Sequence, residues 1–152
     1  MPEKKVIDES REMKREGKAP TTQAGPFVRE EMEHIRHGKH GARSTEQAIA
    51  IGLSKARRAG VKLPPPEKGA ASETTRERAK HDLEVGAHAT KKRPSAKRGR
   101  GVKKALRREP HTAASHAALS KHAKMVARKR GAAKRSAAAQ KAVRTRKSHR
   151  AH

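Results

Sequence analysis

Hydrophobic and polar positions recur at helical spacing through the first part of the chain. Val28, Met32 and Ile35 are separated by four and three residues, so they would lie on one face of a helix. This stripe predicts an amphipathic helix that begins near Thr22 or Pro26 and stops at the next glycine. Proline suits an early helical position, where its missing N–H is not needed.

A second stretch with helical spacing, GARSTEQAIAIGLSKARRAG, precedes a group of prolines. Ile49, Leu53 and Ala56 line one face of the predicted helix. Ser44 followed by Gln47 has the spacing of a capping box, and the glycine that closes the stretch is a natural C-terminal stop. The pattern therefore predicts a helix with defined ends.

The first residues predict one more helix, which is highly charged. It spans residues 3–16 and ends at Gly17. The three predicted helices make an all-α fold class, with a small three-helix head over residues 1–62. So few apolar side chains give only a marginal core.

Residues 63–90 predict a linker. Three consecutive prolines, residues 64–66, favour an extended polyproline stretch that serves as a stiff spacer or as a ligand for a partner domain. The following segment, SETTRERAKHDLEV, predicts a short charged helix. Leu83 and Val85 are its only large apolar residues, so we expect it to dock weakly or not at all.

Residues 91–152 form a tail rich in alanine, lysine and arginine. These residues favour helices, but basic side chains occupy almost every face and repel one another. We therefore expect a tail that is disordered when free or helical on binding a polyanion. Gly131 is expected to divide its most helical part in two.

Composition and charge strengthen this division. Hydrophobic residues make up 32% of the 152 residues, and Phe27 is the single aromatic residue, which argues against one large core. The net charge of +25 is uneven: residues 1–60 hold 13 basic and 9 acidic residues, residues 61–90 hold 5 of each, and residues 91–152 hold 22 basic residues and one acidic residue. A block with that excess of positive charge favours a polyanionic partner.

The chain contains no cysteine, which excludes disulfides and thiolate chemistry. It shows no apolar signal segment and no apolar run long enough to cross a bilayer. We therefore expect a soluble protein without a transmembrane segment, located in the cytoplasm at the nucleoid.

Phosphate contacts are expected from the basic residues of the tail, with arginines as the main contacts and lysines as point charges. Basic residues at the end of the third predicted helix and before it are weaker candidates, because cations there also complement the helix dipole. The main candidates are Arg93, Lys97, Arg98, Arg100, Lys103, Lys104, Arg107, Arg108, Lys124, Arg128, Lys129, Arg130, Lys134, Arg135, Lys141, Arg144, Arg146 and Lys147, and the weaker ones are Arg43, Lys55, Arg57 and Arg58.

Residues 97–101, Lys-Arg-Gly-Arg-Gly, resemble the core of an AT-hook, in which an extended Arg-Gly-Arg lies in a narrow minor groove. The family pattern has proline where this chain has Gly101. A generic basic linker is the alternative interpretation of these residues.

A helix-turn-helix is a further interpretation of the head, because two predicted helices are joined by a short glycine-containing turn. A reading helix needs exposed side chains near its N-terminus that reach base edges. Only Gln47 and Arg43 could serve here, so sequence-specific reading is not expected.

His34, His37 and His40 are spaced by three residues. A metal site would need further ligands, and no cysteine or fixed carboxylate set is evident, so no metal is predicted and the imidazoles are expected to be solvated or to face phosphate.

Glu30, Glu31 and Glu33 are interpreted as helix charges that keep the head near neutrality. No glycine-rich phosphate loop, nucleophile elbow or catalytic triad is present. The sequence therefore predicts no enzyme, no cofactor and no small-molecule substrate.

The tail resembles the alanine- and lysine-rich tails of linker histones and of bacterial histone-like proteins. Residues 15–66 resemble a family of small uncharacterised bacterial proteins that share one domain of unknown function. Members of that family are presumed to bind DNA, and the resemblance implies a domain boundary and a bacterial origin rather than a mechanism.

The sequence thus favours a DNA-binding, nucleoid-associated, histone-like protein that binds without sequence preference by neutralising phosphates. One alternative is an RNA- or ribosome-associated basic protein. Another is a protein-binding head tethered by a polyanion-binding tail, and self-association of the head into a homo-oligomer stays open.

Overall fold

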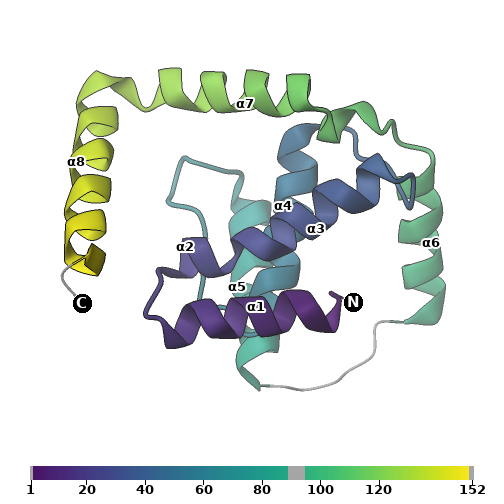
Figure 1. Ribbon diagram of the computed structural model, residues 1–152. Coiled ribbons are helices and arrows are strands. Elements are labelled where there is room, and N and C mark those ends of the chain that lie inside the picture. The colour runs from purple at the N-terminus through teal and green to yellow at the C-terminus, as the bar shows by residue number, and fades with distance from the viewer. Residues whose placement is uncertain (1, 89–94, 151–152) are drawn as a thin grey trace. The chain divides into compact units, whose positions relative to one another are not determined.

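The structure is a computed structural model that describes residues 2–88 and 95–150 (Figure 1). The chain divides into two compact units, Met1–Ser115 and His116–His152, which we call unit 1 and unit 2. The described residues form helices and no β-strand, which confirms the all-α fold class.

The three helices that the sequence predicts for the head are present as α1, α3 and α4, with ends that differ from the predicted ones by a few residues. A short additional helix, α2, precedes α3 and begins at a proline. The helices of unit 1 are α1 (Lys4–Arg15), α2 (Pro20–Gln23), α3 (Gly25–Arg36), α4 (Thr45–Arg58), α5 (Glu73–His88), α6 (Ala96–Arg107) and the 3-10 turn η1 (Thr112–Ala114), and those of unit 2 are α7 (His116–Lys129) and α8 (Gly131–Arg150).

The predicted N-terminal cap of α4 is present. The Ser44 hydroxyl accepts a hydrogen bond from the Gln47 N–H at 3.2 Å. The Gln47 side chain reaches back and accepts one from the N–H of Arg43 at 2.8 Å, one residue before the cap. This pairing differs from a standard capping box by that one residue, and it fixes where α4 begins.

The core of unit 1 lies where α3 meets α4, and it is small. Phe27 and Ile35 are its largest fully buried apolar side chains. The two helices approach closely at Gly52, where an added Cβ atom would lie 2.7 Å from the Cα atom of Val28. Glycine is therefore required at this position, because any side chain would push the helices apart.

Arg57 fastens the chain that follows α4. Its buried guanidinium donates hydrogen bonds to the carbonyls of Leu63 and Pro64, both at 3.1 Å. Burial lowers the pKa of Arg57, and the charge of Asp82 opposes this change. The proline-rich stretch is therefore held against α4 at its start.

Helix α5 packs against α4, although the sequence led us to expect weak docking or none. Ala79 is buried at the contact, and Asp82 accepts a hydrogen bond from the Ser54 hydroxyl at 2.6 Å. Asp82 also pairs with Arg58 at 3.1 Å. Helix α5 has few large apolar residues, which is why the sequence suggested weak docking. Its contact with α4 is made by small side chains and by one acidic residue instead.

The last turn of α6 and the segment that follows it lie against the loop between α3 and α4. The N–H of Gly41 donates to the carbonyl of Leu106 at 2.8 Å, and the N–H of Ala42 donates to that of Pro110 at 3.0 Å. A Cβ atom on Gly41 would lie 1.8 Å from the carbonyl oxygen of Glu109. This segment, within the range predicted as tail, therefore belongs to unit 1.

The turn η1 continues this contact onto α3 and α4. Ala113 and Ala114 are buried. The carbonyl of Ala113 accepts a hydrogen bond from the Thr45 hydroxyl at 2.7 Å, and that of Ala114 accepts one from Arg36 at 2.8 Å. The segment is thus anchored by two buried alanines and by hydrogen bonds from their carbonyls to polar side chains of α3 and α4.

Unit 2 consists of α7 and α8. Gly131, which the sequence predicts as a break, separates the helices with a φ of +70°. No residue of α7 is buried, and Leu119 and Val126 are half-buried. The expectation that this part of the chain is disordered when free stays a prediction.

Replacing Gly86 with alanine tests the contact between α5 and the end of α4. A Cβ atom at this position would lie 2.0 Å from the carbonyl oxygen of Arg57. We expect the free energy of unfolding to fall by about 1–3 kcal/mol, as in other overpacked contacts. Urea denaturation of the full chain measures this change.

The matched control is Gly99→Ala, because a Cβ atom on this α6 glycine has nothing within 4 Å. Alanine is favoured over glycine in a helix, so this variant should be as stable as the parent or slightly more stable. Equal stability of both variants would show that α5 does not pack as described.

Candidate nucleic-acid interface

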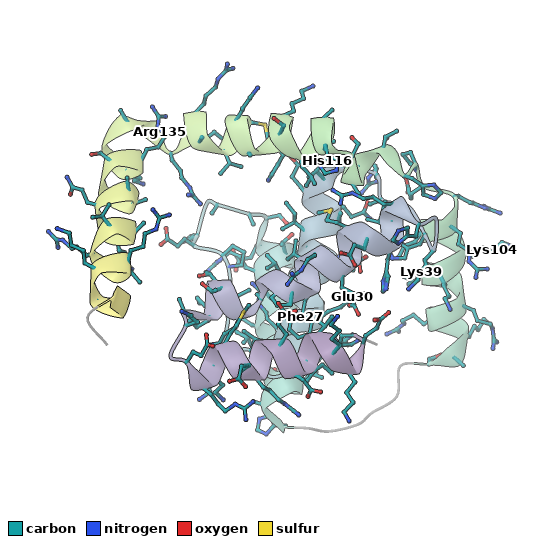
Figure 2. The ribbon with its side chains drawn as sticks, viewed as in Figure 1. Phe27, Glu30, Lys39, Lys104, His116 and Arg135 are labelled. Atoms are coloured by element: carbon teal, nitrogen blue, oxygen red, sulfur yellow. The ribbon has the colours of Figure 1, made fainter. Side chains whose placement is uncertain are left out.

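The basic residues of α6 gather on one side of the helix. At 3.6 residues per turn, the basic side chains of α6 other than Arg98, together with that of Arg108 directly after the helix, fall within about 140° of the helix circumference. Val102 and Leu106 lie on the opposite side. Figure 2 shows long basic side chains standing out from α6. The predicted site residues on or next to this helix, all of them exposed, are Lys97, Arg98, Arg100, Lys103, Lys104, Arg107 and Arg108.

Unit 2 carries ten further predicted site residues of the tail, nine of them on α7 and α8 and one, Arg130, between the two helices. Residues 116–152 hold six lysines, six arginines and no acidic residue. On α8 the basic positions are spread round the whole circumference, and the helix is about 30 Å long. The predicted residues here, all exposed, are Lys124, Arg128, Lys129, Arg130, Lys134, Arg135, Lys141, Arg144, Arg146 and Lys147. Arg93 lies outside the described residues.

The AT-hook interpretation required residues 97–101 to be extended, and the structure contradicts it. These residues lie within α6 and have helical conformation. Two glycines each disfavour the helix by about 1 kcal/mol relative to alanine. The lysines, arginines and alanines around them favour it. The alternative of a generic basic linker stays a prediction.

The four weaker candidates in the head differ in their surroundings. Arg43 is exposed. Arg58 is exposed and pairs with Asp82 on α5, whereas Arg57 is buried and holds the proline-rich stretch. Lys55 points into a buried cluster of charges. Three of the four thus bind groups of the protein itself, and phosphate contact by them stays a prediction.

Two of the three glutamates that we interpreted as helix charges belong to a buried cluster. Glu31 is fully buried and Glu30 is 4% exposed, whereas Glu33 is exposed. The Lys55 ammonium lies 2.6 Å from one Glu31 oxygen and 3.6 Å from one Glu30 oxygen. The other Glu30 oxygen accepts a hydrogen bond from the N–H of Glu3 at 2.7 Å.

A sequence signal for this burial was present. Glu31 lies four residues after Phe27 and four before Ile35, so it occupies the apolar stripe of α3. A carboxylate in such a stripe needs a cation from a neighbouring element, because burial of an unpaired charge is very unfavourable. Lys55, on the helix that packs against α3, supplies it.

The N-terminus of α4 is covered, which bears on the helix-turn-helix interpretation. The buried Thr45 donates its hydroxyl proton to η1, and the Gln47 side chain is engaged in the cap. Docking of this end in a major groove would require both contacts to break. The geometry therefore gives no support to sequence reading by α4.

Replacing Lys55 with methionine tests the buried cluster. The change keeps the length of the side chain and removes the charge, which leaves Glu30 and Glu31 buried without their lysine. We expect the free energy of unfolding to fall on the order of 2–4 kcal/mol, measured by urea denaturation at neutral pH.

Lys62→Met is the matched control, because Lys62 is exposed and follows α4 closely in the chain. This variant should change stability by less than about 0.5 kcal/mol. A Lys55→Met protein as stable as its control would show that the glutamates do not depend on this lysine.

Within the described ranges, every helix is too short or too polar to cross a membrane. Comparison with curated proteins and with solved structures found no match. Comparison with protein families found one, which covers α2, α3, α4 and the proline stretch but neither α1, α5 nor the basic helices. Residues 17–68, about a third of the chain, match the model of a family of unknown function, DUF6496.

Proposed function

We propose that the protein binds duplex DNA without sequence preference and acts as an architectural protein. The observation that carries this proposal is the separation of charge. Unit 2 holds twelve lysines and arginines in its 37 residues, without one acidic residue. The predicted contact residues there are exposed on regular helices.

Binding of this kind is driven by phosphate neutralisation. Each lysine or arginine that contacts a phosphate releases a condensed counterion, and this release favours association at low salt. Basic side chains round the whole of α8 can contact the two phosphate strands that border a groove. The basic face of α6 adds further contacts of the same type.

The structure of the head supports duplex DNA over single strands. Proteins that bind single strands stack bases on exposed aromatic side chains. Phe27, the one residue of the Phe, Tyr and Trp class, is 0% exposed in the core of unit 1. Base stacking on such a side chain is therefore excluded, whereas phosphate contacts are not.

A salt series with two duplexes of unrelated sequence tests the proposal. For six to ten phosphate contacts, the affinity should fall about 10³- to 10⁵-fold between roughly 50 and 200 mM salt, equally for both duplexes. Fluorescence anisotropy of labelled duplexes measures this. A competition experiment with structured RNA is added. If RNA displaces the labelled duplex from the protein more effectively than unlabelled duplex does, RNA is the preferred partner.

Two full-length variants, each with five exposed lysines changed to glutamine, locate the contacts. The unit 2 variant should lower the slope of log affinity against log salt by roughly one for each lysine that contacts phosphate. The unit 1 variant removes the same charge and should keep most of the slope. The substituted lysines are Lys124, Lys129, Lys134, Lys141 and Lys147 in unit 2, and Lys4, Lys5, Lys14, Lys62 and Lys68 in unit 1.

Equal loss of slope in both variants would mean that total charge, and not the basic helices, governs binding. A clear preference between the two duplexes would assign recognition to the head and contradict the absence of sequence reading.

A further inference from the structure

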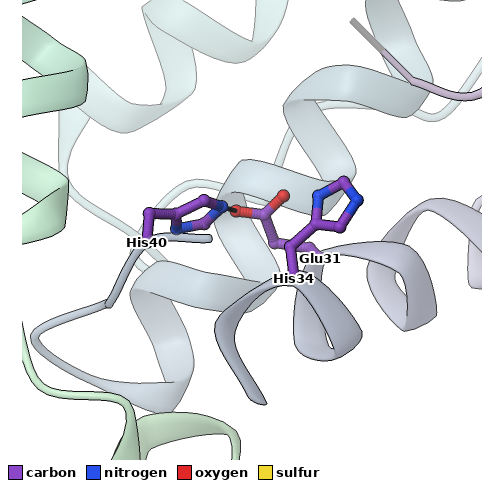
Figure 3. Close-up of side chains that lie close together, drawn as sticks. All are labelled: Glu31, His34 and His40. Carbon is purple, nitrogen blue, oxygen red and sulfur yellow. Dashed lines mark ion pairs between the residues drawn. The ribbon is translucent and has the colours of Figure 1, made fainter. Parts of the chain in front are cut away.

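Two histidines and a glutamate of the head come together in space (Figure 3). Glu31 and His34 lie one turn apart on α3, and His40 lies in the loop that follows it. One potential ligand atom from each of the three side chains lies within 4.8 Å of the other two. Their association was not expected from the sequence, because the glutamate was not predicted to be buried. His37, the third member of the histidine series, is exposed and does not join them.

The Glu31 carboxylate is unusual within the described part of the chain. It is fully buried, and neither oxygen accepts a hydrogen bond of regular geometry there. One oxygen lies 3.2 Å from Nε2 of His40, and the other lies 2.6 Å from the Lys55 ammonium. Lys55 thus contacts one oxygen, while the other faces the imidazole of His40.

The two rings are arranged as ligands of one ion could be. Their centroids are 6.3 Å apart and their planes are inclined by 77°. Two imidazoles on a tetrahedral zinc ion, with Zn–N bonds of about 2.0–2.1 Å, have centroids roughly 5 Å apart. An inward movement of about 1 Å, which the loop position of His40 permits, would therefore complete the arrangement.

Charge also suits a cation. Glu30 and Glu31 place two carboxylates in this region, beside the ammonium group of Lys55. Lys39 adds a second ammonium group, which pairs with the exposed Glu3.

We propose that Glu31, His34 and His40 bind a zinc ion. Two imidazole nitrogens and one carboxylate oxygen are a ligand set that zinc accepts, with water in the fourth position. The imidazole side chains are 14% and 16% exposed, so solvent reaches the site. Lys55 keeps its contact with the second Glu31 oxygen and orients the carboxylate.

A second group, Glu3, Glu30 and His34, shares one histidine with this site and fits zinc less well. It offers a single nitrogen ligand, and the Glu3 side chain is 62% exposed. One Glu30 oxygen is already hydrogen-bonded to the backbone. The two groups compete for His34, so a variant of His40 distinguishes them.

Zinc at the first site would join α3 to the loop that precedes α4. The ion binds the folded chain and not the unfolded one, and it therefore stabilises the head by mass action. This proposal is independent of the proposed function, because its three residues lie on α3 and in the loop after it, whereas the DNA contacts proposed above lie on α6 and in unit 2.

Isothermal titration calorimetry of the full-length, nucleic-acid-free protein with Zn²⁺ tests the site. We expect one ion per chain at micromolar or lower Kd, and a rise in Tm on adding zinc. His34→Ala and His40→Ala should each weaken binding at least tenfold and abolish the rise in Tm. His37→Ala, the matched control on the exposed neighbour, should behave as the parent protein does.

Circular dichroism without zinc shows whether each variant is folded. If His40→Ala is not, His40→Gln keeps a donor for Glu31 while it removes the imidazole ligand, and its affinity decides the matter. The proposal is overturned if the parent protein does not bind zinc, if His37→Ala loses as much affinity as His40→Ala, or if Glu3→Ala loses zinc and His40→Ala retains it.

Discussion

The contact between Glu31 and Lys55 is the constraint on which the head depends. It joins α3 to α4, the two helices on which α1, α5 and η1 pack. A buried ion pair adds little net stability compared with well-packed apolar residues, but loss of one partner is strongly unfavourable. The pair therefore fixes which faces of the two helices meet more than it strengthens their contact.

In this head, polar side chains attach peripheral segments to the central helices, which large apolar residues do in proteins with a larger core. Arg57 binds two carbonyls of the proline stretch, and Thr45 and Arg36 bind the carbonyls of η1. Each contact attaches a segment with few apolar residues of its own to α3 or α4. Directional hydrogen bonds thus define the fold where hydrophobic area is scarce.

The sequence predicted α1, α3 and α4, because each has a periodic apolar stripe or a terminal signal, whereas it predicted neither α2 nor α6. The Ser44 cap and the Gly131 break were both found where the sequence placed them. Docking of α5 was missed because it depends on Ala79 and Asp82, whose residue types are as common on solvated helices. The anchoring of residues 106–114 was missed for a related reason: two alanines and a proline do not stand out in an alanine-rich basic stretch.

The site formed by Glu31, His34 and His40 shows a different limit of prediction from sequence. The position of Glu31 in the stripe of α3 was readable, but the approach of His40 depends on the path of a loop, which periodicity does not describe. Spacing by three grouped His37 with its neighbours, and the structure separates it from them because α3 ends at Arg36.

The backbone hydrogen bonds from Gly41 and Ala42 to the segment after α6 have a mechanical consequence. A helix joined to the head only by a free linker would transmit tension to it only along the covalent chain. Here a load applied to the C-terminal end of α6 reaches the loop between α3 and α4 through two short bonds. Tension on α6 is thus borne by the two helices at the centre of the head, beside His40.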